Sequence, residues 1–135
     1  MSDQAIINAI NTSPLNRGLS GADWLAHGGN VPIVMGDDIA LFDDEGDCNY
    51  QVHFLFVSRG RKAIAAAKEA FRQMFEKYGA DLIFGLVPNF RRDVKMLARW
   101  VGGKLVGVRE TPEGPCELFV LSKEMWSTHV CPACQ

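Results

Sequence analysis

The sequence predicts an α/β domain in which helices flank a mixed β-sheet, with the element order ααβββαβαββ. Two apolar segments, residues 50–57 and 82–87, have too little polar alternation for strands with one face in water. Such strands occur in sheets that helices cover on both faces. Between them, residues 61–78 repeat apolar side chains at intervals of three and four, which is typical of an amphipathic helix. The chain of 135 residues is long enough to bury a core of its own.

Two helices are expected near the N-terminus. Residues 3–11 form the first, and it ends where Ser13 precedes Pro14, because a residue before proline disfavours the helical conformation. The second begins near Ser20 and ends at the glycines that follow His27. Its side chains that face the core are expected to be Ala22, Trp24 and Leu25.

Three strands follow these helices. Residues 31–35 and 39–42 are predicted to pair across a tight turn at residues 36–38, and residues 43–47 form a second, acidic turn. The third strand is the apolar segment 50–57. Its internal polar side chains are expected to be Gln51 and His53.

The second half alternates helices and strands. The helix 61–78 ends at Gly79, and the strand 82–87 ends at Pro88. Asn89 is expected to be the N-cap of a further helix that ends at Gly102 and Gly103. Two last strands form a hairpin, and they cover residues 105–109 and 117–121.

Residues 1–126 are predicted to form one domain, and residues 127–135 a flexible tail that contains cysteines. In the tail, His129, Cys131 and Cys134 are three metal-ligand types within six residues, and the Cys-x-x-Cys spacing suits a zinc knuckle. A second knuckle is missing from the sequence, so a redox pair and a disordered tail stay open beside zinc. We expect no bound metal.

Charge is segregated along the chain. Residues 1–58 hold one basic side chain, Arg17, and eight acidic ones, whereas residues 59–104 hold eleven basic and four acidic ones. A mixed field of this kind favours a small polyanionic ligand and makes a nucleic acid an improbable partner, because nucleic acids need a broader basic surface. The alternative is that these charges only keep opposite faces solvated.

A cytoplasmic protein is expected. The first ten residues show no basic region followed by an apolar one, as a signal peptide would, and no apolar run approaches the roughly 20 residues that cross a bilayer. A membrane partner is therefore not expected. If the chain is encoded by a phage, the same reasoning places it in the host cytoplasm or the virion.

The turn after the third strand is the strongest candidate for a binding site. Arg59, Gly60, Arg61 and Lys62 lie between a buried strand and the long helix. A strand that enters a helix through such a turn directs free backbone N–H groups at one place, which suits a phosphate or pyrophosphate. A basic helix start without a ligand is the alternative.

Over residues 20–125 this order of elements resembles the GNAT acyltransferases. In that family, the corresponding turn carries the pattern Q/R-x-x-G-x-G/A and binds the pyrophosphate of coenzyme A. Arg59 matches the first position, while Lys62 and Ile64 replace the two glycines. The family's tyrosine, which protonates the departing thiolate, would fall near Leu97 or Ala98, and this helix contains no tyrosine.

The resemblance implies acetyl-coenzyme A as cosubstrate and an amine of unknown identity as acceptor. The residues that it assigns to the cofactor are Val57, Ser58, Arg59, Gly60, Arg61, Lys62, Ala63 and Asn89. His53 is the candidate general base, because its ordinary pKa lies near neutral pH. A histidine bonded within the sheet is the other interpretation of His53, and Tyr50 and Asp47 are reserve candidates.

Three functions are compatible with the sequence. The first is N-acyl transfer from acetyl-coenzyme A to an amine, with the thioester between strand residues 54–57 and 83–87. The second is a structural or head-assembly protein of a phage with the same fold and a partner in the particle, in which Phe54, Phe56 and Phe84 fill that space. The third is a regulatory protein that binds a partner through the acidic turn or the tail.

Overall fold

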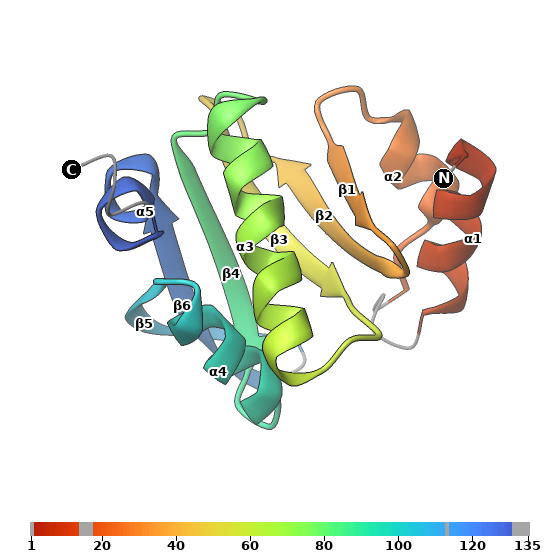
Figure 1. The fold of residues 1–135 in the computed structure, drawn as a ribbon. Helices are drawn as coiled ribbons and strands as arrows, with labels where there is room; N and C mark the ends of the chain where they lie inside the picture. The colour runs from red at the N-terminus through yellow and green to blue at the C-terminus, as the bar shows by residue number, and fades with distance from the viewer. Residues whose placement is uncertain (1, 14–17, 113, 131–135) are drawn as a thin grey trace.

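The computed structural model describes residues 2–13, 18–112 and 114–130. Its elements follow the order ααβββαβαββα (Figure 1). The helices are α1 (Asp3–Thr12), α2 (Gly21–Ala26), α3 (Gly60–Glu76), α4 (Arg92–Trp100) and α5 (Lys123–Val130). The strands are β1 (Val31–Met35), β2 (Asp38–Asp44), β3 (Asn49–Leu55), β4 (Leu82–Pro88), β5 (Lys104–Thr111) and β6 (Gly114–Ser122). No described helix has the length and apolar character needed to cross a membrane.

The predicted α/β architecture with a mixed sheet is confirmed. The six strands lie in the order β1-β2-β3-β4-β6-β5. β3 and β4 run parallel, and the other neighbouring strands are antiparallel. In Figure 1, α3 crosses the face of the sheet that is turned to the viewer, and α1 and α2 lie on the β1 side. The last strand in the sequence, β6, lies between β4 and β5, so β1 and β5 are the edge strands of the sheet.

Helix α5 was not predicted, and it continues through the expected start of the tail at residue 127. Trp126 is the reason, because its side chain is buried and its ring stacks on Phe75 of α3 with 5.3 Å between the ring centroids. The remaining tail, with Cys131 and Cys134, lies outside the described residues, and so does the side chain of His129. The flexible tail and its metal or redox alternatives stay predictions.

Two local predictions were wrong. Asn89 does not cap α4, since the N-cap position belongs to Arg91. Pro88 still belongs to β4, and its carbonyl accepts a hydrogen bond from the Arg91 amide at 2.9 Å, so Asn89 falls inside a turn. The acidic turn is also shorter than predicted, because Asp43 and Asp44 are the last residues of β2.

The sheet separates two hydrophobic clusters. Alternate residues of β2 show this: Ala40 and Phe42 join a large cluster with α3, whereas Ile39 and Leu41 join a smaller one with α1 and α2. Trp24 lies in the smaller cluster as predicted, while Ala22 is exposed. The two faces of β3 therefore meet different surroundings, with Phe54 toward α3 and Leu55 toward α1 and α2.

The sheet is split in its middle. β3 and β4 pair only from Asn49 with Leu82 to Gln51 with Phe84. Beyond this point β3 stays paired with β2 and β4 stays paired with β6, so the two parallel strands end apart from each other. The predicted separation between the third and fourth strands is present, and it begins after Phe84 in β4, two residues later than expected, and after Gln51 in β3, two residues earlier.

Asp38 ties the chain that follows β3 to the other half of the sheet. Its side chain is only 4% exposed, and its Oδ1 atom accepts hydrogen bonds from the amides of Val57 at 2.8 Å and Ser58 at 2.9 Å. Burial alone would raise the pKa of Asp38, but the hydrogen bonds from Ser58 and Val57 outweigh burial and hold the pKa below its ordinary value.

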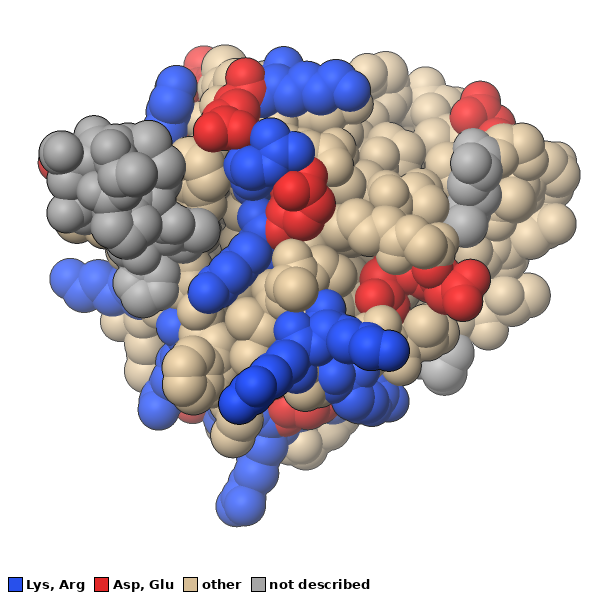
Figure 2. All heavy atoms as spheres, in the orientation of Figure 1, with Lys and Arg blue, Asp and Glu red and all other residues tan. Residues whose placement is uncertain are grey.

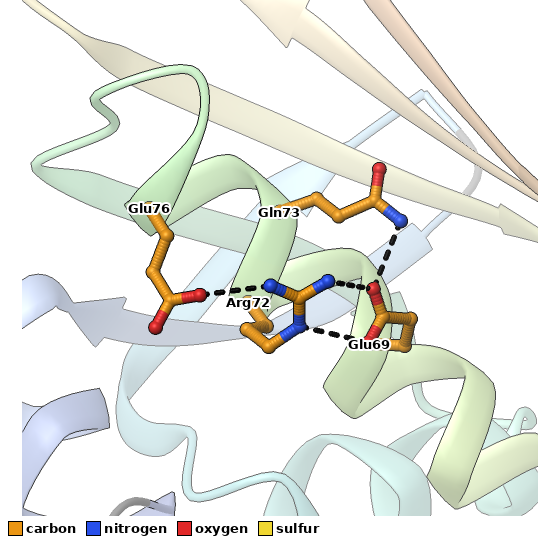
Figure 3. A network of polar contacts seen from close by, with 4 residues as sticks. All are labelled: Glu69, Arg72, Gln73 and Glu76. Atoms are coloured by element: carbon orange, nitrogen blue, oxygen red, sulfur yellow. Dashed lines mark hydrogen bonds and ion pairs between the residues drawn. The ribbon is translucent and has the colours of Figure 1, made fainter.

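The outer face of α3 carries a network of charged side chains (Figure 3). Arg72 binds Glu69 at one side and Glu76 at the other, and Gln73 donates to Glu69 at 2.9 Å. The hydrogen bond from Arg72 is the main reason why the pKa of Glu69 falls to about 2. Because these side chains are exposed to solvent, the network contributes little to the stability of the fold.

Replacing Asp38 should destabilise the protein. The variant Asp38→Ala removes the charged acceptor of the Val57 and Ser58 amides, so we expect the free energy of unfolding to fall by about 2 kcal/mol. Asp38→Asn keeps one acceptor oxygen and should lose less. Urea unfolding of the three proteins measures the difference, and equal stability of wild type and Asp38→Ala would contradict this role.

The same contact makes stability depend on pH. Because the pKa of Asp38 is lower in the folded protein than its ordinary value of 3.8, its contribution is present above that value. The contribution is lost as the pH falls through the folded-state pKa. Unfolding curves of the Asp38→Asn variant between pH 6 and about 2 should therefore lack this part of the acid destabilisation.

Candidate active site

The separation of β3 and β4 opens a cavity of about 100 Å³, which we call the strand cavity. Val52, His53 and Phe54 line it from β3, and residues 83–88 line it from β4. Val94, Ala98 and Val101 close it at the side of α4. The cavity thus passes between the two parallel strands and lies at their carboxyl ends, where open α/β sheets usually bind ligands.

A second cavity of about 170 Å³, the helix cavity, lies between the start of α3 and α4. These two helices are neighbours at the lower end of the molecule in Figure 1. Phe54, Arg91 and Val94 line both cavities, so they form a shared wall. The two cavities are therefore adjacent, and these three side chains lie between them.

The predicted cofactor residues fall into two groups. Four of them line the helix cavity, namely Ser58, Arg59, Gly60 and Ala63. Arg61 and Lys62 are exposed on the first turn of α3. Val57 is also exposed, with its amide bound to Asp38, and the Asn89 side chain accepts a hydrogen bond from Lys95 at 3.3 Å.

The start of α3 has features of an anion site. Arg59 occupies the N-cap position, and its side chain makes no capping hydrogen bond. The N-cap side chain therefore leaves the backbone N–H groups of the first turn of α3 available to a ligand. Gly60 has a φ of 61°, a left-handed conformation that glycine adopts without strain. Figure 2 shows lysine and arginine side chains gathered where α3 begins and α4 lies. Positive charge and helix amides therefore coincide.

His53 projects from β3 to the face opposite α3, the face that carries α1 and α2. Its Nε2 atom lies 2.8 Å from Oδ2 of Asp43 on the neighbouring strand β2. The other carboxylate oxygen of Asp43 accepts the indole N–H of Trp24 from α2. Asp43 thereby fixes the orientation of the His53 ring, which lines the strand cavity and keeps 31% of its side chain exposed.

The charge state of Asp43 determines which nitrogen of His53 is free. Burial would raise the pKa of Asp43, but the hydrogen bond and charge of His53, with the Trp24 indole, outweigh burial and lower the pKa. An ionised carboxylate only accepts hydrogen bonds, so Nε2 of His53 must carry a proton. Nδ1 is then the nitrogen that can accept a proton from a bound molecule.

The reserve candidates lie elsewhere. Tyr50 packs against the cluster on the α3 side of the sheet, and burial raises its pKa. Asp47 is exposed in the turn between β2 and β3, with a φ of 55°. Among the described residues, no three potential metal ligands come together.

Sequence reasoning missed Asp43, Trp24 and Arg91 as parts of the site. Asp43 was placed in an exposed turn, and only the pairing of Leu41 with His53 brings its carboxylate beside the histidine. Arg91 was one of several basic residues, and the turn after β4 places it in the wall between the cavities. Residues 39–42 before Asp43 are all apolar and buried, so no period-two alternation marks Asp43 as part of the strand.

Comparison with solved structures identifies the fold. The protein superposes on a spermidine N-acetyltransferase chimera, SpeG from Vibrio cholerae and hSSAT, with a TM-score of 0.73 and 9% identity, covering 93% of this chain and 94% of that one. For an aminoglycoside acetyltransferase, AAC(6')-Ib, in complex with coenzyme A and kanamycin, the TM-score is 0.69 at 12% identity, with 95% of each chain covered.

A third similar structure is RimJ of Mycobacterium smegmatis in complex with coenzyme A disulfide, with a TM-score of 0.65, 14% identity, and coverage of 90% of this chain and 78% of that one. No protein-family model matches the sequence, and no curated protein matches it. At these identities the likeness establishes the fold: it is the GNAT fold, as the sequence resemblance implied.

Removing His53 should raise the pKa of Asp43. In the variant His53→Ala, the carboxylate loses the largest of the interactions that lower its pKa, while burial still acts in the opposite direction. A titration of the Asp43 carboxyl carbon by NMR should therefore move toward or above the ordinary value of 3.8. His27→Ala, which removes the weakest of these interactions, is the matched control and should cause a smaller change.

Proposed function

We propose that the protein is an N-acyltransferase that transfers an acyl group from a coenzyme A thioester, such as acetyl-coenzyme A, to an amine. The observation that carries the proposal is that the two cavities lie side by side and share Phe54, Arg91 and Val94 as lining residues. Coenzyme A has a pyrophosphate, which needs cations, and a long pantetheine arm, which needs an apolar groove. The basic start of α3 and the two cavities offer these two environments side by side.

The start of α3 would hold the pyrophosphate. Ser58, Arg59 and Gly60 lie where the helix cavity opens, and Arg61 and Lys62 add positive charge beside it. Arginine binds phosphate oxygens through charge-assisted hydrogen bonds, which compensate for the bulk of Lys62 and Ile64 at two positions where the family has glycine. Because Asp38 occupies the amides of Val57 and Ser58, the pantetheine arm would rely on the cavity walls rather than on these amides.

The solved structures support the proposal by analogy. AAC(6')-Ib was solved with coenzyme A and an aminoglycoside, and the spermidine N-acetyltransferase chimera bears the name of an amine substrate. Aminoglycosides and spermidine share primary amines. An amine acceptor is therefore the acceptor class that we propose for this chain.

His53 would act as the general base. The acceptor arrives as an ammonium ion on the α1 and α2 face, and Nδ1 of His53 takes one of its protons. The freed lone pair attacks the thioester carbon, the C–N bond forms and the C–S bond breaks. The nitrogen loses its second proton to water, and the coenzyme A thiolate takes a proton from water. Asp43 would stabilise the resulting imidazolium.

A structural role receives no support from the described side chains. Phe54, Phe56 and Phe84 would have to fill the space between the strands, but each of them lines a cavity instead. The rings of Phe54 and Phe56 lie 4.9 Å apart in a tilted arrangement, and Phe54 also meets Phe71 edge-on at 5.9 Å. These aromatic contacts hold the wall of the site and leave its interior open.

Calorimetric titration of acetyl-coenzyme A tests the proposal. We expect binding on the order of micromolar, and the double variant Arg59→Ala/Lys62→Ala should bind at least about tenfold more weakly, because each charge-assisted contact contributes about 1.5 kcal/mol or more. Arg109→Ala, an exposed cation on β5, is the matched control and should bind normally. Absence of binding by the wild-type protein at low salt and at two temperatures would refute the proposal.

Loss of His53 should affect turnover and spare the cofactor. The variant His53→Gln should lower kcat/KM by about a hundredfold or more, because it cannot accept a proton at neutral pH. Release of coenzyme A thiol with a panel of primary amines measures the rate, and acetyl-coenzyme A binding should stay unchanged. His27→Gln supplies the control, and equal rates for His53→Gln and wild type would exclude His53 as the base.

A further inference from the structure

We propose that the protein prefers acyl groups longer than acetyl, of about four carbons, and that the α4 end of the strand cavity holds the acyl chain. This inference rests on the proposed function, because it assumes that a coenzyme A thioester reaches the strand cavity. Three features of the strand cavity support a longer acyl chain. The cavity has an apolar end, small residues line that end, and the end lies apart from His53 and beside the helix cavity.

The space is apolar where the chain would lie. Val94, Ala98 and Val101 form its wall on the side of α4. Ile83 of β4, Phe71 of α3 and Phe119 of β6 complete that end. The polar side chains of the cavity, His53 and Arg91, come from β3 and from the turn after β4. Water in the apolar end would find few hydrogen-bond partners, whereas a hydrocarbon chain needs none.

Small residues keep this end open. Ala98 projects a single methyl group from the middle of α4. Gly103 cannot carry a side chain, because a Cβ atom would lie 2.8 Å from the carbonyl oxygen of Ala98. Gly85 of β4 leaves room beside Val52, whose Cγ1 atom would lie 3.4 Å from an added Cβ. Three neighbouring positions on the wall thus contribute almost no side-chain volume.

The size of the cavity sets the length of the chain. A cavity of about 100 Å³ holds roughly three groups of methylene size, at about 30 Å³ for each. An acetyl group has one methyl beyond its carbonyl carbon and would leave most of this space empty. A butyryl group, with three carbons beyond its carbonyl carbon, fills this space, and a hexanoyl group, with five, exceeds it.

The position of the cavity gives the acyl chain a direction. A thioester that enters at Phe54, Arg91 and Val94 has the apolar end beside it, at Ala98 and Val101, and His53 at the other face of the sheet. The acyl chain can therefore extend toward α4 without occupying the side from which the amine approaches. A longer chain would not block attack at the carbonyl carbon.

The first measurement is calorimetric titration of coenzyme A and of its acetyl, butyryl, hexanoyl and decanoyl thioesters into the wild-type protein. Each buried methylene strengthens binding about fourfold, so butyryl-coenzyme A should bind roughly tenfold more tightly than acetyl-coenzyme A. Affinity should be highest near butyryl, gain nothing further at hexanoyl and fall at decanoyl. Equal affinity for all thioesters, or tightest binding of the acetyl compound, would overturn this inference and leave the proposed function standing.

Two variants should shift the preference in opposite directions. Ala98→Leu fills the apolar end and should remove the gain from acetyl to butyryl, with coenzyme A itself bound as in the wild type. Val94→Ala enlarges the same space and should move the optimum to a longer chain. Ala65→Leu, the same change as the first on the exposed side of α3, is the matched control and should keep the wild-type preference.

The outcomes separate the two proposals. Binding of no thioester and no coenzyme A overturns both. Binding of all compounds with no dependence on chain length, or a preference that Ala98→Leu and Ala65→Leu change alike, overturns the acyl-chain inference alone. If Ala98→Leu does not fold, two measurements still test the acyl-chain inference. The wild-type protein should bind butyryl-coenzyme A about tenfold more tightly than acetyl-coenzyme A, and Val94→Ala should bind a longer chain most tightly.

Discussion

The loss of pairing between β3 and β4 after Gln51 and Phe84 is the constraint on which the rest of the structure depends. Two parallel strands in the middle of a sheet normally continue their hydrogen bonds to their ends. Here each strand keeps its other neighbour, and Asp38 holds the amides of Val57 and Ser58 on the β2 side. The chain leaving β3 is thereby drawn away from β4. A buried carboxylate is costly unless it is fully bonded, and its bonds to the two amides meet that condition.

The split places two chemically different surfaces at one opening. On the α3 face, the opening meets the basic start of α3 and the apolar side of α4, which suit a phosphate and a hydrocarbon arm. On the other face, it meets His53, which Asp43 and Trp24 hold from β2 and α2. Successive side chains of β3 point to opposite faces of the sheet, so Phe54 lies on the α3 face and His53 on the other face. A group-transfer site needs two reactants to approach one carbon from different sides, and this sheet provides both approaches.

The fold followed from the sequence because local patterns determined its central unit. The apolar segment that became β3, the amphipathic repeat of α3 and the apolar β4 are each specified by their own residues. The two failures have different causes. Trp126 makes α5 part of the fold by stacking on Phe75, a contact between residues far apart in the sequence. The start of α4 failed locally, because the carbonyl of Pro88 accepts the Arg91 amide in a turn that includes Asn89.

The candidate site was predictable to the same extent. Arg59, Gly60 and His53 could be chosen by residue type and position, since charge, glycine and histidine restrict chemistry locally. Asp43 could not, because an aspartate after an apolar strand usually begins a turn, and its bond to His53 depends on the register between β2 and β3. The cavities were equally hidden, because each is lined by residues from elements that are far apart in the sequence.

The absence of a tyrosine from α4 does not deprive the proposed reaction of a necessary group. A thiol has an ordinary pKa of about 8.5, whereas an alkylammonium ion has one of about 10.4. At neutral pH the thiolate is therefore a stable leaving group that water can protonate, but the amine is inert until it loses a proton. Deprotonation is the step that needs a positioned group, and His53 with Asp43 is placed to supply it. The methyl group of Ala98 then leaves room for a longer acyl chain where a phenol ring would stand.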